Sequence, residues 1–230
     1  MCQVCYYQDK TIIGIATAAH VVDHAEEWQE PIRIKNHKSE EVIFLKESQR
    51  IIYPKYQNDS AVILFQKPKF DFPEKLIPLF PSDQRIGLGC EVGWLGFPAF
   101  EAQTLCFFTG SISARQEPRK AYLIDGVAIN GVSGGPVIYS TDAEGPCIVG
   151  VMTAYQANRR GGDVLPGLSI AQDVSHFHEI IQTVKSIDDA KRMKQETETK
   201  IETTSKAEVA PEPIAPKTPT PKTKRKSKSN

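Results

Sequence analysis

Between Ile12 and about Ala171 the chain is a series of short apolar runs separated by Gly, Pro, Asn and Asp. The runs are rich in Val, Ile, Phe and Tyr, which favour extended strands. Many short strands at this spacing predict an all-β sandwich or barrel. The expected strands are Ile12–Thr17, Ile32–Ile34, Val42–Leu45, Arg50–Tyr53, Ala61–Phe65, Glu91–Leu95, Thr104–Phe108, Ala121–Ile124, Pro136–Tyr139 and Ile148–Thr153.

A proline-rich stretch sets the domain boundaries that we expect. Residues 70–85 contain three prolines and favour neither a strand nor a helix, as is typical of a connection between two β halves. We therefore predict one domain over residues 1–172. Its first β-barrel would cover about residues 1–70, and its second about residues 86–172.

After Asp173 apolar residues recur at helical spacing. This stripe predicts a C-terminal helix over residues 173–202 that docks by its apolar face. The stripe consists of Phe177, Ile180, Ile181, Val184 and Ile187. From Thr203 to Asn230 the residues Pro, Thr, Lys and Glu dominate, so we expect a disordered basic tail there.

The formal net charge of zero hides an uneven distribution. Residues 217–230 carry six basic side chains and no acidic one, which leaves 22 basic and 28 acidic side chains in the rest of the chain. The body is mildly acidic and the tail is basic. Because the tail lacks interleaved aromatic residues and a folded scaffold, we expect it to aid solubility and to bind no specific nucleic acid.

The sequence predicts neither a membrane span nor a signal peptide. Residues 1–10 lack a positive region followed by an apolar one, and no run of 18 apolar residues occurs. The five cysteines are odd in number and suit free thiols in a reducing compartment, so we expect a cytoplasmic protein. Cys2 and Cys5 have the spacing of a zinc or redox pair, but no second pair follows. We therefore expect no metal and no other cofactor.

Three segments each hold one member of a nucleophilic triad. His20 follows two small residues at the end of a predicted strand, Asp59 precedes a strongly apolar strand, and Ser133 lies among glycines. A serine hydroxyl becomes an effective nucleophile when a base takes its proton, and the resulting oxyanion needs fixed donors. The flanking glycines allow a sharp turn that points the N–H groups of Gly131 and Ser133 at one spot.

The order His20, Asp59, Ser133 resembles that of the chymotrypsin-like (trypsin-fold) serine peptidases, in particular the bacterial HtrA-type branch. The resemblance covers roughly residues 10–180 and implies two six-stranded antiparallel β-barrels with the site in the crevice between them. Other segments occur in the order that this branch shows, namely Leu95–Pro98, Gly110–Ala114, Asp125–Asn130 and Val149–Ala154.

The resemblance implies a serine endopeptidase that hydrolyses peptide bonds through an acyl-enzyme. Ser133 would be the nucleophile, His20 the general base and then acid, and Asp59 the carboxylate that orients His20. The N–H groups of Gly131 and Ser133 would form the oxyanion hole.

The resemblance also implies a substrate-binding surface. Thr153, Ala154 and Tyr155 would bind the substrate strand by main-chain pairing, with the Thr153 hydroxyl near Asp59. Val127 stands six residues before the nucleophile, where many secreted members place the pocket floor. An acidic floor is absent, so we expect a preference for small or apolar side chains.

Two departures from the family pattern change what we expect. Val132 stands where secreted members that mature by cleavage carry an Asp, so activation of that type is not expected. Only 19 residues precede His20, so the first barrel is expected to lack its outermost N-terminal strand or to have it severely shortened. Either the gene start is misplaced, a partner supplies the strand, or the barrel is open.

These departures leave two alternatives to an autonomous protease. One is a catalytically silent binding module that keeps the protease scaffold. The other is a protease that is active only when a partner completes the first barrel. The expected partners are polypeptide substrates and, for the second alternative, a strand-supplying partner or a second copy of the chain. No PDZ-like domain follows the protease segment in the sequence.

Overall fold

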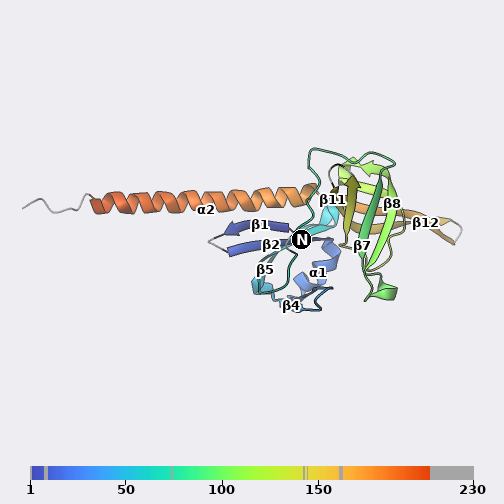
Figure 1. Ribbon diagram of the computed structural model, residues 1–230, viewed down its shortest axis with the longest axis horizontal. Coiled ribbons are helices and arrows are strands. Elements are labelled where there is room, and N and C mark those ends of the chain that lie inside the picture. Colours follow the sequence, from blue (N-terminus) through green and yellow to red (C-terminus); the bar gives the residue numbers. More distant parts are fainter. Residues whose placement is uncertain are drawn as a thin grey trace, which may run out of the picture. The chain divides into compact units, whose positions relative to one another are not determined.

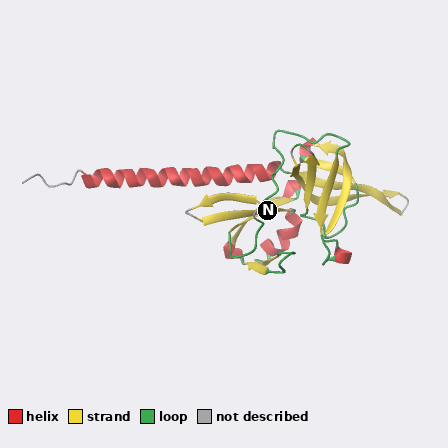
Figure 2. Ribbon diagram, in the orientation of Figure 1, coloured by secondary structure: helices red, strands yellow, loops and turns green. Residues whose placement is uncertain are grey.

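The computed structural model describes residues 2–7, 10–73, 75–141, 143, 145–160 and 163–207. The chain forms two compact units, residues 1–189 and residues 190–230. The first unit consists mostly of strands (Figures 1 and 2). The elements are β1 (Cys2–Tyr7), β2 (Lys10–Thr17), α1 (Ala19–Glu27), β3 (Ile32–Lys35), β4 (Val42–Leu45), β5 (Arg50–Lys55), β6 (Ser60–Gln66), β7 (Glu91–Gly96), β8 (Cys106–Gln116), β9 (Ala121–Asp125), β10 (Pro136–Thr141), β11 (Gly145–Arg160), β12 (Asp163–Asp173) and α2 (Ser175–Ala207).

The second half of the first unit is the six-stranded antiparallel barrel that the sequence predicts. Its strands close in the order β10-β11-β12-β9-β8-β7. Figure 1 labels β7, β8 and β11 in the wall of this barrel. Alternate side chains of each strand point inward, and Trp94, Ile112, Ile124, Val137 and Val149 are at most 1% exposed. These residues belong to one core that also includes Val62 of β6.

The expectation of a six-stranded first barrel is wrong for the described residues. The N-terminal half is a four-stranded sheet in the order β1-β2-β6-β5, and β3 and β4 form a separate hairpin. The chain leaves the sheet after β2 to form α1, and the short strands β3 and β4 pair only with each other there. The segment before His20 does supply a strand, because β1 pairs with β2. The two edges of this sheet are therefore β1 and β5.

A second core lies under α1 in the N-terminal half. Ala19 and Val22 of α1 pack with Leu45 of β4, Ile63 of β6 and Phe65. The helix has no side-chain cap at Ala18. Packing against the sheet and the hairpin therefore stabilises this nine-residue helix, since isolated helices of this length are marginal.

The connection between the halves is neither helix nor strand, as predicted for residues 70–85. It nevertheless runs against the barrel, because Phe80 N donates to Ile148 O at 2.8 Å and Ile148 N donates to Pro78 O at 2.8 Å. Leu79 and Ile148 form an isolated parallel bridge at the same place.

The C-terminal helix docks largely as its apolar stripe predicts. Phe177 and Ile180 are buried and Ile181 and Val184 are partly buried against the barrel core, whereas Ile187 is 45% exposed. The helix begins two residues later than expected and extends to Ala207, beyond the predicted tail boundary at Thr203. The rest of the predicted tail, residues 208–230, lies outside the described residues. In the second unit the described side chains, residues 190–198, are all exposed.

No helix in the described part of the chain combines the length and apolarity needed to cross a membrane.

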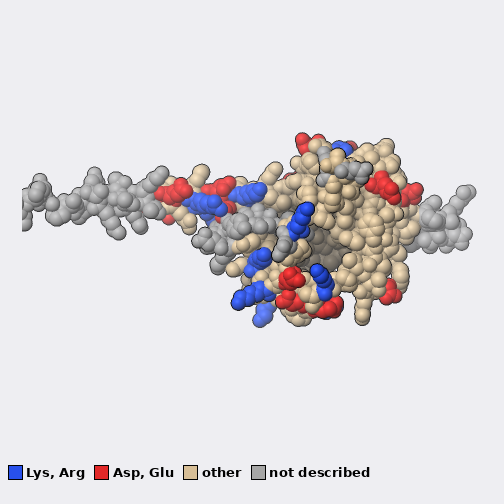
Figure 3. Space-filling view, viewed as in Figure 1, with Lys and Arg blue, Asp and Glu red and all other residues tan. Residues whose placement is uncertain are grey.

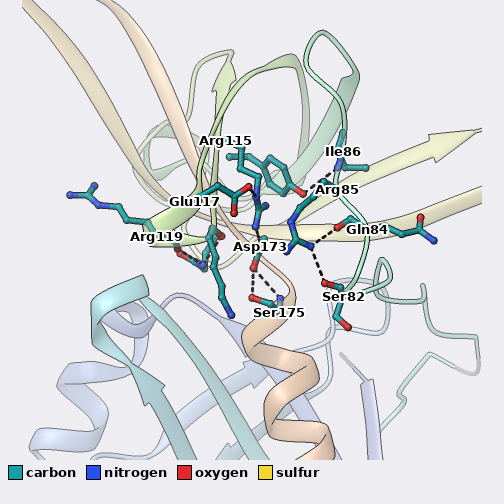
Figure 4. A network of polar contacts seen from close by, with 12 residues as sticks. Ser82, Gln84, Arg85, Ile86, Arg115, Glu117, Arg119, Asp173 and Ser175 are labelled. Carbon is teal, nitrogen blue, oxygen red and sulfur yellow. Dashed lines mark hydrogen bonds and ion pairs between the residues drawn. The ribbon is translucent and has the colours of Figure 1, made fainter.

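A buried ion pair fixes the start of α2. Arg115 Nη2 lies 2.6 Å from Asp173 Oδ2, and the two side chains are only 9% and 6% exposed. Figure 4 shows these side chains converging where β12 ends and α2 begins, with Glu117 on the other side of the guanidinium. The second Asp173 oxygen accepts from Ser175 N at 3.1 Å and Ser175 Oγ at 2.6 Å. One carboxylate thus joins β8 to the first turn of the helix.

Replacing Asp173 by Ala is expected to lower the free energy of unfolding by about 3–5 kcal/mol, because it leaves the Arg115 guanidinium buried without its main partner. Urea unfolding followed by circular dichroism measures this. The matched change at exposed Asp83 should cost about 0.5 kcal/mol or less. Equal costs at the two positions would show that the buried pair does not stabilise the fold.

His176 lies in the first turns of α2 and is buried, with both ring nitrogens lacking a hydrogen-bond partner. Glu179 Oε2 is 3.9 Å from its Nδ1, too far for a hydrogen bond. Burial, and next the positive charge of Lys55, lowers the pKa of His176 below its ordinary value of 6.5. The folded protein therefore favours the neutral imidazole more strongly than the unfolded chain does.

This difference predicts an acid-sensitive contribution to stability. As the pH falls below about 6.5 the unfolded chain takes up a proton at His176 before the folded protein does, so stability falls until the lower folded pKa is passed. Urea titrations at pH 7.5 and 5.5 measure the free energy of unfolding. This free energy should fall less with pH in His176→Gln than in the wild type, and the difference should be at most about 1.4 kcal/mol per pH unit. A wild-type pH dependence in His176→Gln would contradict the assignment.

Candidate functional site

His20 and Asp59 meet because of how β2 pairs with β6. The ladder ends with Thr17 opposite Ala61, which brings the residues after β2 and before β6 to the same edge of the sheet. His20 Nδ1 lies 2.8 Å from Asp59 Oδ2, and His20 N donates to Asp59 Oδ1 at 3.0 Å. The carboxylate thus binds the ring and the backbone of His20 together. With Nδ1 donating to Asp59, Nε2 is left as an acceptor.

The backbone of Asp59 is held in a left-handed conformation. Its φ and ψ are both 46°, and its N–H donates to Tyr56 O at 3.1 Å. Asp is among the few residues other than glycine that adopt this region readily. The preceding residue, Asn58, donates from Nδ2 to Arg119 O at 2.6 Å, which joins this turn to the β8–β9 connection of the barrel.

Ser133 lies on a glycine-rich turn between β9 and β10. Gly131 and Gly134 have φ of +96° and +82°, which side chains rarely adopt. Gly134 N donates to Met152 O at 2.8 Å, and Met152 N donates to Gly135 O at 2.9 Å. The turn is therefore tied to β11 on both sides of Gly134.

The same glycines allow the turn to pack closely on its neighbours. A Cβ at Gly135 would lie 2.0 Å from Leu95 O of β7, and one at Gly131 would lie 2.4 Å from Phe97 O. A Cβ at Gly134 would lie 2.4 Å from Thr17 Oγ1, at the end of β2. The loop that carries Ser133 thus touches the strand that leads to His20.

The hydroxyl of Ser133 does not bond to His20 in the described residues. Ser133 Oγ donates instead to Thr153 O at 3.5 Å. No acceptor for the N–H of Gly131 or of Ser133 occurs among the described residues, which leaves both free to bind an oxyanion. Val132 is 2% exposed and packs in the barrel core, as its apolar side chain requires.

The predicted substrate-binding residues lie on β11 and on a neighbouring loop. Thr153 is buried and its hydroxyl donates to Ile170 O at 3.2 Å. Ala154 is exposed, and Tyr155 Oη accepts from Gly167 N at 2.6 Å. Val127 is 53% exposed.

Sequence reasoning missed Ser169, which anchors the loop of Val127. Ser169 on β12 is fully buried; its hydroxyl donates to Gly126 O at 2.6 Å and accepts from Ala128 N at 2.8 Å. The only hint in the sequence is that this serine lies between two apolar residues.

Arg50 is the second residue that the sequence reasoning missed. Its side chain is 1% exposed and donates to Ala25 O of α1 at 2.8 Å, to Glu30 O at 2.7 Å and to Leu45 O at 2.8 Å. It holds the end of α1, the helix that contains His20 in its first turn, against the β3–β4 hairpin. An arginine at the start of a strand carries no sequence signal for this role.

The face of the molecule seen in Figure 3 is uneven in charge. In Figure 3 charged side chains gather over the N-terminal elements, the barrel face is largely uncharged, and the surface is hollowed between the two. Within the described residues no group of three or more His, Cys, Asp or Glu side chains could hold a metal ion. Cys90, Cys106 and Cys147 are partly buried, and Cys147 Sγ donates to Tyr139 O at 3.4 Å.

Solved structures of HtrA-type proteases share this architecture. The serine endoprotease from Yersinia pestis matches with a TM-score of 0.53 and 18% identity, covering 76% of this chain and 56% of that one. A variant of the HtrA-type protease AlgW with a decapeptide matches with a TM-score of 0.53 and 20% identity, covering 75% and 48%. The chain has a trypsin-like serine peptidase fold. It spans about half the length of these two trypsin-fold proteins. No family model and no curated protein matches the sequence.

The tight fit of the serine loop predicts different costs for two glycine substitutions. Gly89→Ala should cost about 1–2 kcal/mol, because Gly89 has φ +78° but open space around it. Gly134→Ala should cost about 1–3 kcal/mol more, because its methyl group would overlap Thr17. Urea unfolding of the two variants measures the difference. Equal losses would mean that the loop does not pack on β2 as described.

Proposed function

We propose that the protein is a serine endopeptidase that hydrolyses peptide bonds through an acyl-enzyme. The observation that carries the proposal is the double hydrogen bond from His20 to Asp59, which fixes an imidazole whose Nε2 has no hydrogen-bond partner among the described residues. The Ser133 loop has two N–H groups for which the described part of the chain offers no acceptor, and it packs on the strand that leads to this histidine.

Substrate would bind along the free edge of β11. Thr153 O accepts from Ser133 Oγ, so this carbonyl faces the serine and is turned away from β12. A substrate N–H that donates to Thr153 O would replace this hydrogen bond and free the hydroxyl to turn toward His20. Ala154 and Tyr155 extend the same edge for main-chain pairing. Val127 on the adjacent loop favours small or apolar substrate side chains.

In the reaction, Ser133 Oγ attacks the scissile carbonyl carbon while His20 Nε2 takes the hydroxyl proton. The N–H groups of Gly131 and Ser133 stabilise the negative oxygen of the tetrahedral intermediate. Asp59 stabilises the imidazolium, which then donates its proton to the leaving amine. Water activated by the same imidazole hydrolyses the acyl-enzyme and restores Ser133.

A protease completed by a partner is the second candidate, and the open N-terminal sheet favours it. The edges β1 and β5 can accept a further strand, and β1 pairs directly with β2, which leads to His20. A second copy or another polypeptide that adds a strand would stabilise the segment that holds the base. We propose that activity of this kind would rise with protein or partner concentration.

A fluorophosphonate probe tests the proposed function. The wild type should be labelled on Ser133, and Ser133→Ala should not, whereas Ser140→Ala, at an exposed serine of β10, should label normally. His20→Ala should label about 10²–10⁴-fold more slowly, because it removes the base. His24→Ala, one turn further along α1, should keep the wild-type rate.

The labelling rate measured across protein concentrations separates the two candidates. A rate per molecule that is independent of concentration supports an autonomous protease, and a rising rate supports the partner-completed form. A folded protein that is not labelled at any concentration would contradict both the autonomous protease and the form completed by a second copy.

A further inference from the structure

A cavity of about 340 Å³ lies behind the candidate site, between the N-terminal sheet, the connection, the barrel and α2. It touches the chain segments of all three candidate catalytic residues. Ala16 of β2 is four residues before His20, Val62 of β6 is three residues after Asp59, and Gly134 follows Ser133 directly. The cavity is therefore next to the site but does not include its reacting groups.

The walls of the cavity are apolar. Leu79 of the connection and Ile148 of β11 form one side, and Phe177 and Ile181 of α2 form another. A cavity of this volume falls within the range of sites for small organic molecules, which are mostly apolar with a few polar groups.

Lys75 gives the described lining of the cavity a cationic side chain. It is the charged residue among the described lining residues, and it is exposed. Among the described side chains no carboxylate lies within ion-pair distance of its ammonium. An apolar chamber with an exposed lysine among its lining residues is complementary to a molecule that has an apolar chain and an anionic head.

We propose that this cavity binds a free acyl-chain carboxylate, with the chain among the apolar walls and the carboxylate at Lys75. Burial of the chain supplies most of the affinity, because it removes apolar surface from water. The carboxylate contributes less, since its partner is exposed.

The ligand would also affect Ser133, and this part of the proposal rests on the proposed function. With the cavity filled, the ends of β2 and β6 have less room to move relative to the Ser133 loop. Less movement favours the arrangement in which the base and the nucleophile can meet. Bound ligand should therefore accelerate the reaction of Ser133.

Titration calorimetry with decanoate, kept below its micelle-forming concentration, tests the binding site. One decanoate should bind per chain, and Ile181→Trp, which fills the cavity, should abolish this binding. Ile187→Trp provides the matched control, because Ile187 lies on the same helix but is not part of the cavity lining and should leave binding intact. Absence of binding to the wild type, or wild-type affinity in folded Ile181→Trp, would overturn the proposal.

A second comparison tests the role of Lys75 without altering the walls. Lys75→Ala should weaken decanoate binding about two- to fivefold and leave decanol binding unchanged, because decanol has no charge. The control Lys69→Ala, at an exposed lysine outside the lining, should change neither. Equal weakening of both ligands by Lys75→Ala would contradict the carboxylate assignment.

The rate of fluorophosphonate labelling with and without saturating decanoate tests the coupling. We expect labelling to become about fivefold faster. An unchanged rate in protein that binds decanoate would overturn the coupling. If Ser133 is not labelled in either condition, the proposed function fails and the coupling with it, whereas the calorimetry still decides the binding site.

Discussion

The antiparallel pairing of β2 with β6 is the constraint on which the candidate site depends. It ends at Thr17 and Ala61, so the next residues on both strands emerge at one edge of the sheet. The left-handed turn at Asp59 then places its carboxylate where the backbone and ring of His20 can both donate to it. Arg50 secures α1, which carries His20 in its first turn, by binding a carbonyl near the other end of the helix.

The barrel positions Ser133 in a different way, through close packing of the loop that carries it. Glycines let the Ser133 loop lie against β7 and against Thr17 with no side chain between them, so the loop is located by contact with both halves. Asn58 adds a hydrogen bond to the carbonyl of Arg119 in the barrel. Because these are noncovalent contacts between two β structures, the relative position of base and nucleophile depends on how the open N-terminal sheet is supported. The cavity behind the site lies at this junction.

The sequence predicted those elements whose residue pattern matches their burial. β6 has six consecutive buried residues, and its apolar run was recognised. Helix α1 was missed because Ala18 provides no cap and the helix is short. β12 was missed because its inward residues include Ser169 and Ala171, so alternation of apolar residues is weak.

A six-stranded first barrel was expected from resemblance alone, since the pairing partners of short strands such as β3 cannot be derived from local pattern. The positions of His20, Asp59 and Ser133 came from motifs, and the structure brings the first two into contact. Their catalytic roles stay predictions. Arg50 and Ser169 could not be predicted, because a polar residue in a strand is usually exposed and only tertiary structure shows that these two bind buried carbonyls.

Detection of the acyl-enzyme tests the central claim most directly. Protein mixed with an activated ester of a peptide ending in a small apolar residue, and quenched in acid, would be measured by intact mass and then by peptide mapping. The account predicts a mass increase equal to one acyl group, located on Ser133 and decaying when the quench is delayed after the ester is exhausted. No adduct on folded protein, or an adduct on another residue that persists in Ser133→Ala, would contradict it.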